Sequence, residues 1–206
     1  MAVAPILEVD VVHPQPRIVE RAAAVLDAGG IIAYPTDSYY GIGCSLNSKK
    51  AIERIYAIKN RDRKKPLAFL CPDLANVSKY AKISNFAYRI MRQLTPGPFT
   101  IVLEATRLVP QMMQSKQNQV GIRVPQAPVM HAITTALGVP IVTTSAQDEH
   151  GQILTDAKEI KEAIGARIDL ILDGGSQQSD PSTVVSLIDD RIEILRQGKG
   201  ILVIDR

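Results

Sequence analysis

Short apolar runs alternate with helix-like segments along most of this 206-residue chain, and that alternation limits the possible folds more than any single motif. Runs of β-branched and other apolar residues, bounded by glycine, proline or polar residues, predict buried strands. These runs occupy residues 31–34, 67–71, 99–105, 120–125, 140–144 and 168–172. Helical periodicity or capping signals predict helices at 17–26, 48–58, 73–80, 85–94, 127–137 and 155–164. Strands and helices in alternation predict an α/β domain.

Two features indicate that the sheet is mixed rather than purely parallel. Apolar segments at 183–188 and 191–196 flank Asp189-Asp190, which predicts a late hairpin. Thr95-Pro96-Gly97-Pro98 predicts a rigid turn. We therefore expect a single α/β domain over residues 1–206, with its core at about 18–200. Its sheet should be open and twisted, with parallel and antiparallel strands flanked by helices.

Local signals set the remaining expectations along the chain. Ser48 and Thr155 are typical helix N-caps, and Gly29-Gly30 ends the first helix. Further strands are predicted at 6–12 and 201–204. The Gln-rich segment 106–119 has weak periodicity and its structure stays open, whereas residues 148–154 predict a mobile loop.

The composition is that of an ordinary globular protein, with 46% apolar and 22% charged residues. No apolar run is long enough to span a bilayer, and the N-terminal segment lacks the pattern of a signal peptide. We therefore expect a cytoplasmic protein that does not contact membranes. Cys44 and Cys71 have no metal-like spacing with the three histidines, so we expect two buried, reduced thiols.

The most informative local stretch joins a polar turn to a basic loop. Thr36-Asp37-Ser38 follows the apolar run 31–34, and residues 49–65 contain eight basic residues against two acidic ones. The net charge of +3 is too small to indicate nucleic-acid binding by itself. Taken separately, the turn is usually only a turn and the basic run is usually a solvated surface. Together they could hold a small anionic ligand.

Polar or basic residues recur just past the apolar runs, where ligands collect in open α/β sheets. No phosphate-binding glycine loop of the GxxxxGK or GxGxxG type is present, and no Ser–His–Asp arrangement stands out. Arginine suits bidentate recognition of carboxylates and phosphates. We expect one cavity for a carboxylate and phosphates, formed by residues that include Ser38, Lys59, Arg61, Lys65, Arg123, Thr143, Ser145, Ser182 and Arg196.

An ordered set of motifs carries a family resemblance. The motifs are PTDSYYGIGC, KNRDRKKPLAFL, LTPGPFTIVL, GIRVP, TTSAQ, DPSTVV and ILRQGKG. In that order they resemble the YrdC/YciO family in its short, single-domain form, from about Ile18 to Gly200. This family includes the threonylcarbamoyl-AMP synthases. The resemblance implies a twisted α/β sheet with an open, positively charged concave surface.

The resemblance also implies an activity and a division of roles. L-threonine, bicarbonate and ATP, with Mg²⁺, would give threonylcarbamoyl-AMP and pyrophosphate. A downstream threonylcarbamoyl transferase would use the product to modify tRNA. Ser38, Arg123, Thr143 and Ser182 would bind threonine, and Arg61, Lys65, Ser145 and Arg196 would bind the nucleotide. Lys59 and Arg61 would be catalytic, and no metal-binding residue is implied.

Two departures from the family pattern favour a second interpretation. Ser145-Ala146-Gln147 replaces a Ser-Ala-Asn turn and continues into acidic Asp148-Glu149, which would weaken phosphate binding unless the acids bind Mg²⁺ or face solvent. Ser38 stands where the family has threonine. The alternative is a YciO-like protein that binds tRNA or double-stranded RNA through the basic concavity, with little or no synthase activity. An amino-acid pocket requires Ser38, Arg123 and Ser182 to face inward together, whereas RNA binding requires only the basic surface.

Overall fold

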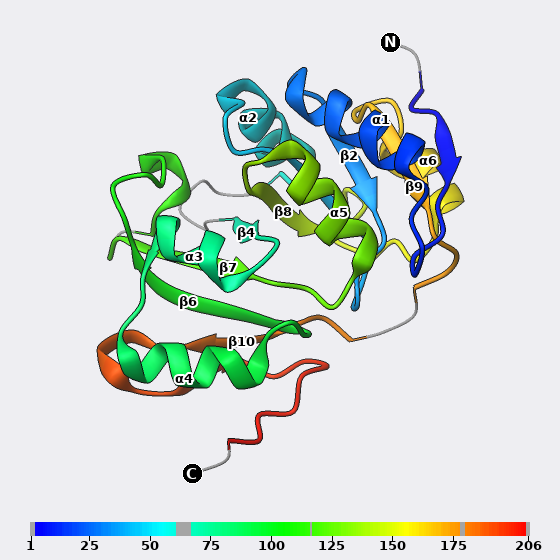
Figure 1. Ribbon diagram of the computed structural model, residues 1–206. Helices are drawn as coiled ribbons and strands as arrows, with labels where there is room; N and C mark the ends of the chain where they lie inside the picture. The colour runs from blue at the N-terminus through cyan, green and yellow to red at the C-terminus, as the bar shows by residue number, and fades with distance from the viewer. Residues whose placement is uncertain (1–2, 61–66, 116, 178–179, 205–206) are drawn as a thin grey trace.

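A mixed β-sheet runs through the whole molecule, with helices on both faces (Figure 1). The computed structural model describes residues 3–60, 67–115, 117–177 and 180–204. Within these ranges, the strands are β1 (Ile6–Glu8), β2 (Ile31–Tyr34), β3 (Gly41–Ser45), β4 (Ala68–Leu70), β5 (Ala81–Lys82), β6 (Phe99–Ala105), β7 (Gln119–Arg123), β8 (Ile141–Ser145), β9 (Leu170–Asp173), β10 (Thr183–Ser186) and β11 (Glu193–Arg196). The helices are α1 (Pro16–Asp27), α2 (Lys49–Ile58), α3 (Leu74–Tyr80), α4 (Asn85–Leu94), α5 (Pro128–Leu137) and α6 (Ala157–Ile164).

The strand order confirms the expected mixed sheet. Neighbouring strands follow the order β1-β9-β2-β3-β8-β4-β7-β6-β10-β11, and β5 pairs with β6. The pairs β1–β9, β2–β9, β4–β7 and β6–β10 are parallel, whereas β2–β3, β3–β8, β4–β8, β6–β7 and β10–β11 are antiparallel. The late hairpin is β10–β11, and Asp189 and Asp190 in its loop both have positive φ angles. A hairpin loop of this kind favours short polar residues at such positions.

The two faces of the sheet are covered unequally. Helices α1 and α5 pack against each other over one face, where they bury Ile32, Tyr34, Leu70 and Ile141. The opposite face carries the larger core, to which α2, α3, α4 and α6 all contribute. Side chains alternate along a strand, so Thr143 lies on the α1–α5 face while Val142 points into the larger core. Beyond α5, the first face remains open over β4, β7, β6 and β10, and this opening positions the site.

The sequence prediction was wrong at 41–45, where it placed no strand and the structure has β3. The glycines of β3 interrupt the run of apolar residues by which a strand is predicted, but they are needed for packing. The Tyr34 ring on β2 lies across β3, and a Cβ atom on Gly43 would come within 2.7 Å of the Tyr34 hydroxyl. A Cβ atom on Gly41 would lie 2.8 Å from the same ring. Glycine is therefore required where an aromatic side chain crosses a neighbouring strand.

Several other predicted boundaries of strands and helices differ from those in the structure. The first strand covers Ile6–Glu8 rather than 6–12, and residues 201–204 form no strand. Asp156, not Thr155, caps α6, because its carboxylate accepts the N–H groups of Lys158 and Glu159. The Gln-rich segment contains one short 3₁₀ turn, Gln111–Met113. Both cysteines are free and buried, as expected, and burial raises the pKa of each thiol to about 12.

Candidate functional site

A pocket of about 360 Å³ opens on the sheet face beyond α5. Its floor is made by residues of β8, β4, β7, β6 and β10, and the turn after β2 forms one wall. Small residues such as Ala68 and Gly121 leave open space above the middle of the floor. Of the nine predicted site residues, those that line it are Ser38, Arg123, Thr143, Ser145, Ser182 and Arg196. The structure thus brings together side chains that are separated by up to 158 positions in sequence (Ser38 and Arg196).

Arg123 occupies one end of the pocket as half of a largely buried ion pair. Its side chain is 12% exposed and that of its partner Asp37 is 10% exposed. Nη2 donates to the Asp37 carboxylate and, at 2.8 Å, to the Ser38 hydroxyl. The Nε group is buried and has no hydrogen-bond partner among the described residues. An incoming carboxylate would therefore meet a guanidinium that is already oriented but whose donors are not all used.

The Thr36–Ser38 turn is held by its own hydroxyl groups. Thr36 Oγ1 donates to the Tyr39 carbonyl at 2.6 Å and accepts the Ser38 N–H at 3.0 Å. Both Thr36 and Ser38 are buried, which is uncommon for polar turn residues. The Asp37 carboxylate also accepts the Gln126 N–H at 2.9 Å. This turn is therefore fixed against β7 and the segment after it, rather than being a solvated loop.

Ser182 and Arg196 form the wall contributed by the late hairpin. The Ser182 hydroxyl is 2.9 Å from that of Thr100, and Arg196 Nη2 donates to the Ser182 carbonyl at 2.7 Å. Ser182 is buried and Arg196 is exposed. The arginine thus lies at the open side of the pocket, while the serine lies deeper on the same wall.

Two tyrosines support the site but were not predicted. The Tyr34 hydroxyl is 2.6 Å from Thr143 Oγ1, and burial raises the Tyr34 pKa well above its ordinary value. Tyr40 donates to the Gly175 carbonyl and accepts the Gly174 N–H, and burial raises its pKa to about 12. Both phenols therefore stay neutral and act as hydrogen-bonding supports. The sequence feature that could have pointed to Tyr34 is the pair of glycines opposite it on β3, because they make room for its ring.

Lys59 lies beside the pocket rather than in its lining. Its ammonium group donates to the Ser145 carbonyl at 3.1 Å and to the Gln147 side-chain carbonyl. This joins the end of α2 to the turn after β8, as a shared site would require. Arg61 and Lys65 fall outside the described residues. The predicted mobile loop 148–154 is closed by a bridge between Gln147 and Ile153.

The described residues contain no group of three or more His, Cys, Asp or Glu side chains that could hold a metal ion. Asp37, the acid at the pocket, has both oxygens engaged by Arg123 and by the Gln126 N–H. Within the described residues, this carboxylate is therefore not free to hold a metal ion. No helix in the described part of the chain is long and apolar enough to cross a membrane.

Comparison with known proteins identifies relatives over most of the chain. Residues 24–198 match the model of the Sua5/YciO/YrdC family, described as "Telomere recombination". The uncharacterized protein YciO of Escherichia coli is 37% identical over 190 residues, covering 91% of this chain and 92% of that protein. A threonylcarbamoyl-AMP synthase of Chromobacterium violaceum is 33% identical over 181 residues, covering 87% and 93%.

Solved structures give the same result. The crystal structure of E. coli YciO superposes with a TM-score of 0.91 at 35% identity, covering 96% of this chain and 97% of that one. P. abyssi Sua5, crystallised with L-threonine, superposes with a TM-score of 0.85 at 25% identity over 95% of this chain and 58% of its own. The matched sequence and the shared mixed sheet lead to one conclusion: the chain belongs to the Sua5/YciO/YrdC family.

Proposed function

We propose that this protein is a threonylcarbamoyl-AMP synthase that uses L-threonine, bicarbonate and ATP. The observation that carries the proposal is the convergence of Arg123, Ser38 and Ser182 on one pocket. An amino-acid ligand requires these three side chains to face inward together, whereas binding to a phosphate backbone does not. The threonine carboxylate would bind Arg123, and the hydroxyls of Ser38, Thr143 and Ser182 would bind its polar groups.

The reaction depends on positioning and cationic stabilisation more than on a strong base. The amino group of threonine attacks the bicarbonate carbon, and water leaves to give a carbamate. A carbamate oxygen then bonds to the α-phosphorus of ATP. The bond from the α-phosphorus to the bridging oxygen breaks, and pyrophosphate leaves. Lys59 and Arg61 would stabilise the charge that develops on the phosphates, and Lys65, Ser145 and Arg196 would hold the nucleotide. Mg²⁺ would enter with ATP.

The carbamate intermediate is unstable and has to be protected from water. Carboxylated threonine decomposes in water, so it must be made and adenylated in one protected place. The buried floor around Thr143 and Ser182 and the wall formed by the Thr36–Ser38 turn would shield the carbamate on those sides, and the pocket is open on the side of Arg196. The product would then pass to a transferase that modifies tRNA, and we expect this to occur in the cytoplasm.

Pyrophosphate release from ATP, Mg²⁺, bicarbonate and threonine tests the proposal. We expect release to require both threonine and bicarbonate. Replacing Arg61 or Arg123 with alanine should lower the rate by about 10²–10³-fold, as with other preorganised cationic contacts. Arg89→Ala is the matched control, because Arg89 is exposed on α4 and does not line the pocket.

Three outcomes would contradict the proposal. Release that is unchanged without threonine or without bicarbonate would exclude the synthase reaction. Wild-type rates for the Arg61 and Arg123 variants would exclude the assigned roles. Retention of tRNA or double-stranded RNA that disappears with added salt, without any turnover, would favour the RNA-binding alternative.

A further inference from the structure

The segment just after β11 is built onto the wall that carries Ser182. We call residues 197–200 the C-terminal strap. The buried Thr183 hydroxyl donates to the Gly200 carbonyl at 2.6 Å and accepts the Gly198 N–H at 2.9 Å. A Cβ atom on Gly198 would overlap the Pro181 carbonyl, so the strap lies flush against this wall. These contacts fix its backbone independently of its exposed side chains.

Lys199 extends from the strap to the opposite wall of the pocket. Its backbone N–H donates to the Pro181 carbonyl at 2.8 Å, and its ammonium group donates to the Asp37 carbonyl at 2.6 Å. Asp37 follows β2 and Lys199 follows β11, and in the sheet β3, β8, β4, β7, β6 and β10 lie between them. One side chain therefore connects the two ends of this curved surface directly.

Asp37 links the Lys199 contact to the end of the pocket where ligand is expected to bind. Its carboxylate is paired with Arg123 and accepts the Gln126 N–H, while the adjacent Ser38 accepts from the same guanidinium. A shift of the Asp37 backbone would move Ser38 and loosen the orientation of Arg123. Lys199 does not line the pocket, so its effect must pass through Asp37.

We propose that Lys199 is a positioning residue that sets the spacing between the Ser38–Arg123 end of the pocket and the Ser182 wall. The inference rests on the proposed function, since the ligand whose groups require this spacing is threonine. Carboxylate and hydroxyl contacts lose strength steeply when they are displaced or misaligned. Removing the Lys199 contact should therefore weaken threonine binding more than ATP binding or the chemical step.

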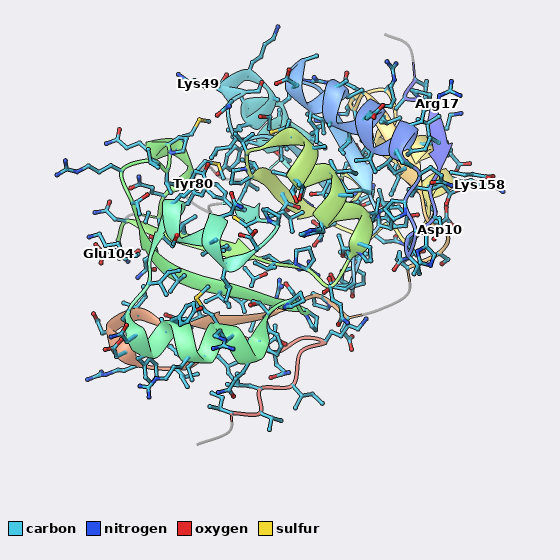
Figure 2. The ribbon with its side chains drawn as sticks, in the orientation of Figure 1. Asp10, Arg17, Lys49, Tyr80, Glu104 and Lys158 are labelled. Atoms are coloured by element: carbon cyan, nitrogen blue, oxygen red, sulfur yellow. The ribbon has the colours of Figure 1, made fainter. Side chains whose placement is uncertain are left out.

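The test compares Lys199→Met, which keeps the length of the side chain but not its donor, with Lys199→Arg, which keeps a charged donor. We expect Lys199→Met to raise the KM for threonine and the Kd for threonine alone by about 3- to 10-fold, the effect of losing one hydrogen bond. The kcat and the KM for ATP should change by less than about 2-fold, and Lys199→Arg should restore most of the threonine affinity. Lys158→Met on α6 is the control, because Figure 2 shows Lys158 at the edge of the molecule, far from the strap.

A second measurement separates this inference from the proposed function. The Arg123 Nε–H is buried in the wild type, so its NMR signal should exchange slowly with water, and faster in Lys199→Met. If the wild type does not bind threonine but Lys199→Met still speeds this exchange, the proposed function is wrong and the positioning role stands. An increase in the KM for ATP alone, or unchanged exchange together with unchanged threonine affinity, would overturn the inference.

Discussion

The substitution Gly43→Ala tests how the pocket floor is built. A Cβ atom at this position would lie 2.5 Å from Ile141 Cγ2, 2.7 Å from the Tyr34 hydroxyl and 2.8 Å from the Val142 carbonyl. All of these atoms are in the buried sheet, where neighbours cannot move aside freely. The Tyr34 hydroxyl would have to leave its 2.6 Å contact with Thr143. One added methyl group on β3 should therefore disturb the hydrogen bond between Tyr34 on β2 and Thr143 on β8.

The expected loss combines two effects. Overpacking a well-packed core typically costs about 1–3 kcal/mol. Leaving the buried hydroxyls of Tyr34 and Thr143 unpaired costs about 1–3 kcal/mol more. We therefore expect Gly43→Ala to lower the free energy of unfolding by about 2–6 kcal/mol. Tyr34→Phe removes the hydroxyl that is displaced, so the alanine should cost about 1–2 kcal/mol less in that background than in the wild type.

Urea unfolding followed by far-ultraviolet circular dichroism measures all four members of this cycle. Gly121→Ala is the matched control, because a Cβ atom there would meet its nearest neighbour, Thr100 Cγ2, at 3.4 Å. That variant should be unchanged or more stable by about 0.5–1 kcal/mol, since glycine is unfavourable inside a strand. A Gly43→Ala loss below about 0.5 kcal/mol, or strictly additive losses in the cycle, would refute the packing account of Tyr34.

Three further predictions concern stability. Arg123→Met should lower the free energy of unfolding by about 3–5 kcal/mol, because Asp37 loses its buried partner, and adding Asp37→Asn should recover part of that loss in urea titrations. Burial raises the pKa of Cys44 and Cys71 from 9.0 to about 12, so the unfolded thiols ionise first and stability should fall between those pH values. Replacing both cysteines with alanine should reduce that pH dependence, as measured by thermal unfolding. Asp156→Ala should cost about 0.5–2 kcal/mol through loss of the α6 cap, and Asp156→Ser should restore most of it.

The elements that could be predicted are those whose local pattern agrees with their place in the fold. Helix α4 combines a capping serine, Ser84, with an amphipathic face, and its limits at 85–94 were confirmed. Strand β3 could not be found in this way, because Gly41 and Gly43 serve the Tyr34 ring of a neighbouring strand rather than their own. The predicted strand at 201–204 failed for the opposite reason. Its four residues are all apolar, as in a buried strand, but Ile201 and Val203 are exposed and the segment pairs with no described strand.

The convergence of the polar residues was predictable, but their partners were not. Residues that follow or end apolar runs, such as Ser38 and Ser145, were expected to meet because strand ends gather ligands in α/β sheets. The pairing of Asp37 with Arg123 joins positions 86 residues apart, and the contact between Lys199 and Asp37 joins positions 162 apart. Such contacts depend on how strongly the sheet curves, which no local pattern encodes.

The two acidic residues that follow Gln147 differ in their surroundings. The Asp148 carboxylate accepts the N–H groups of His150 and Gln152 at 2.9 and 2.8 Å, so it stabilises its own turn. The Glu149 side chain is 81% exposed and lies next to His150. Water and salt screen such a charge strongly, so it should oppose phosphate binding far less than a buried acid would. Gln147, in turn, presents its carbonyl to Lys59. The departure from the family turn therefore keeps an oxygen acceptor for the lysine. Of the two added carboxylates, that of Asp148 is held within its own turn and that of Glu149 is exposed to solvent.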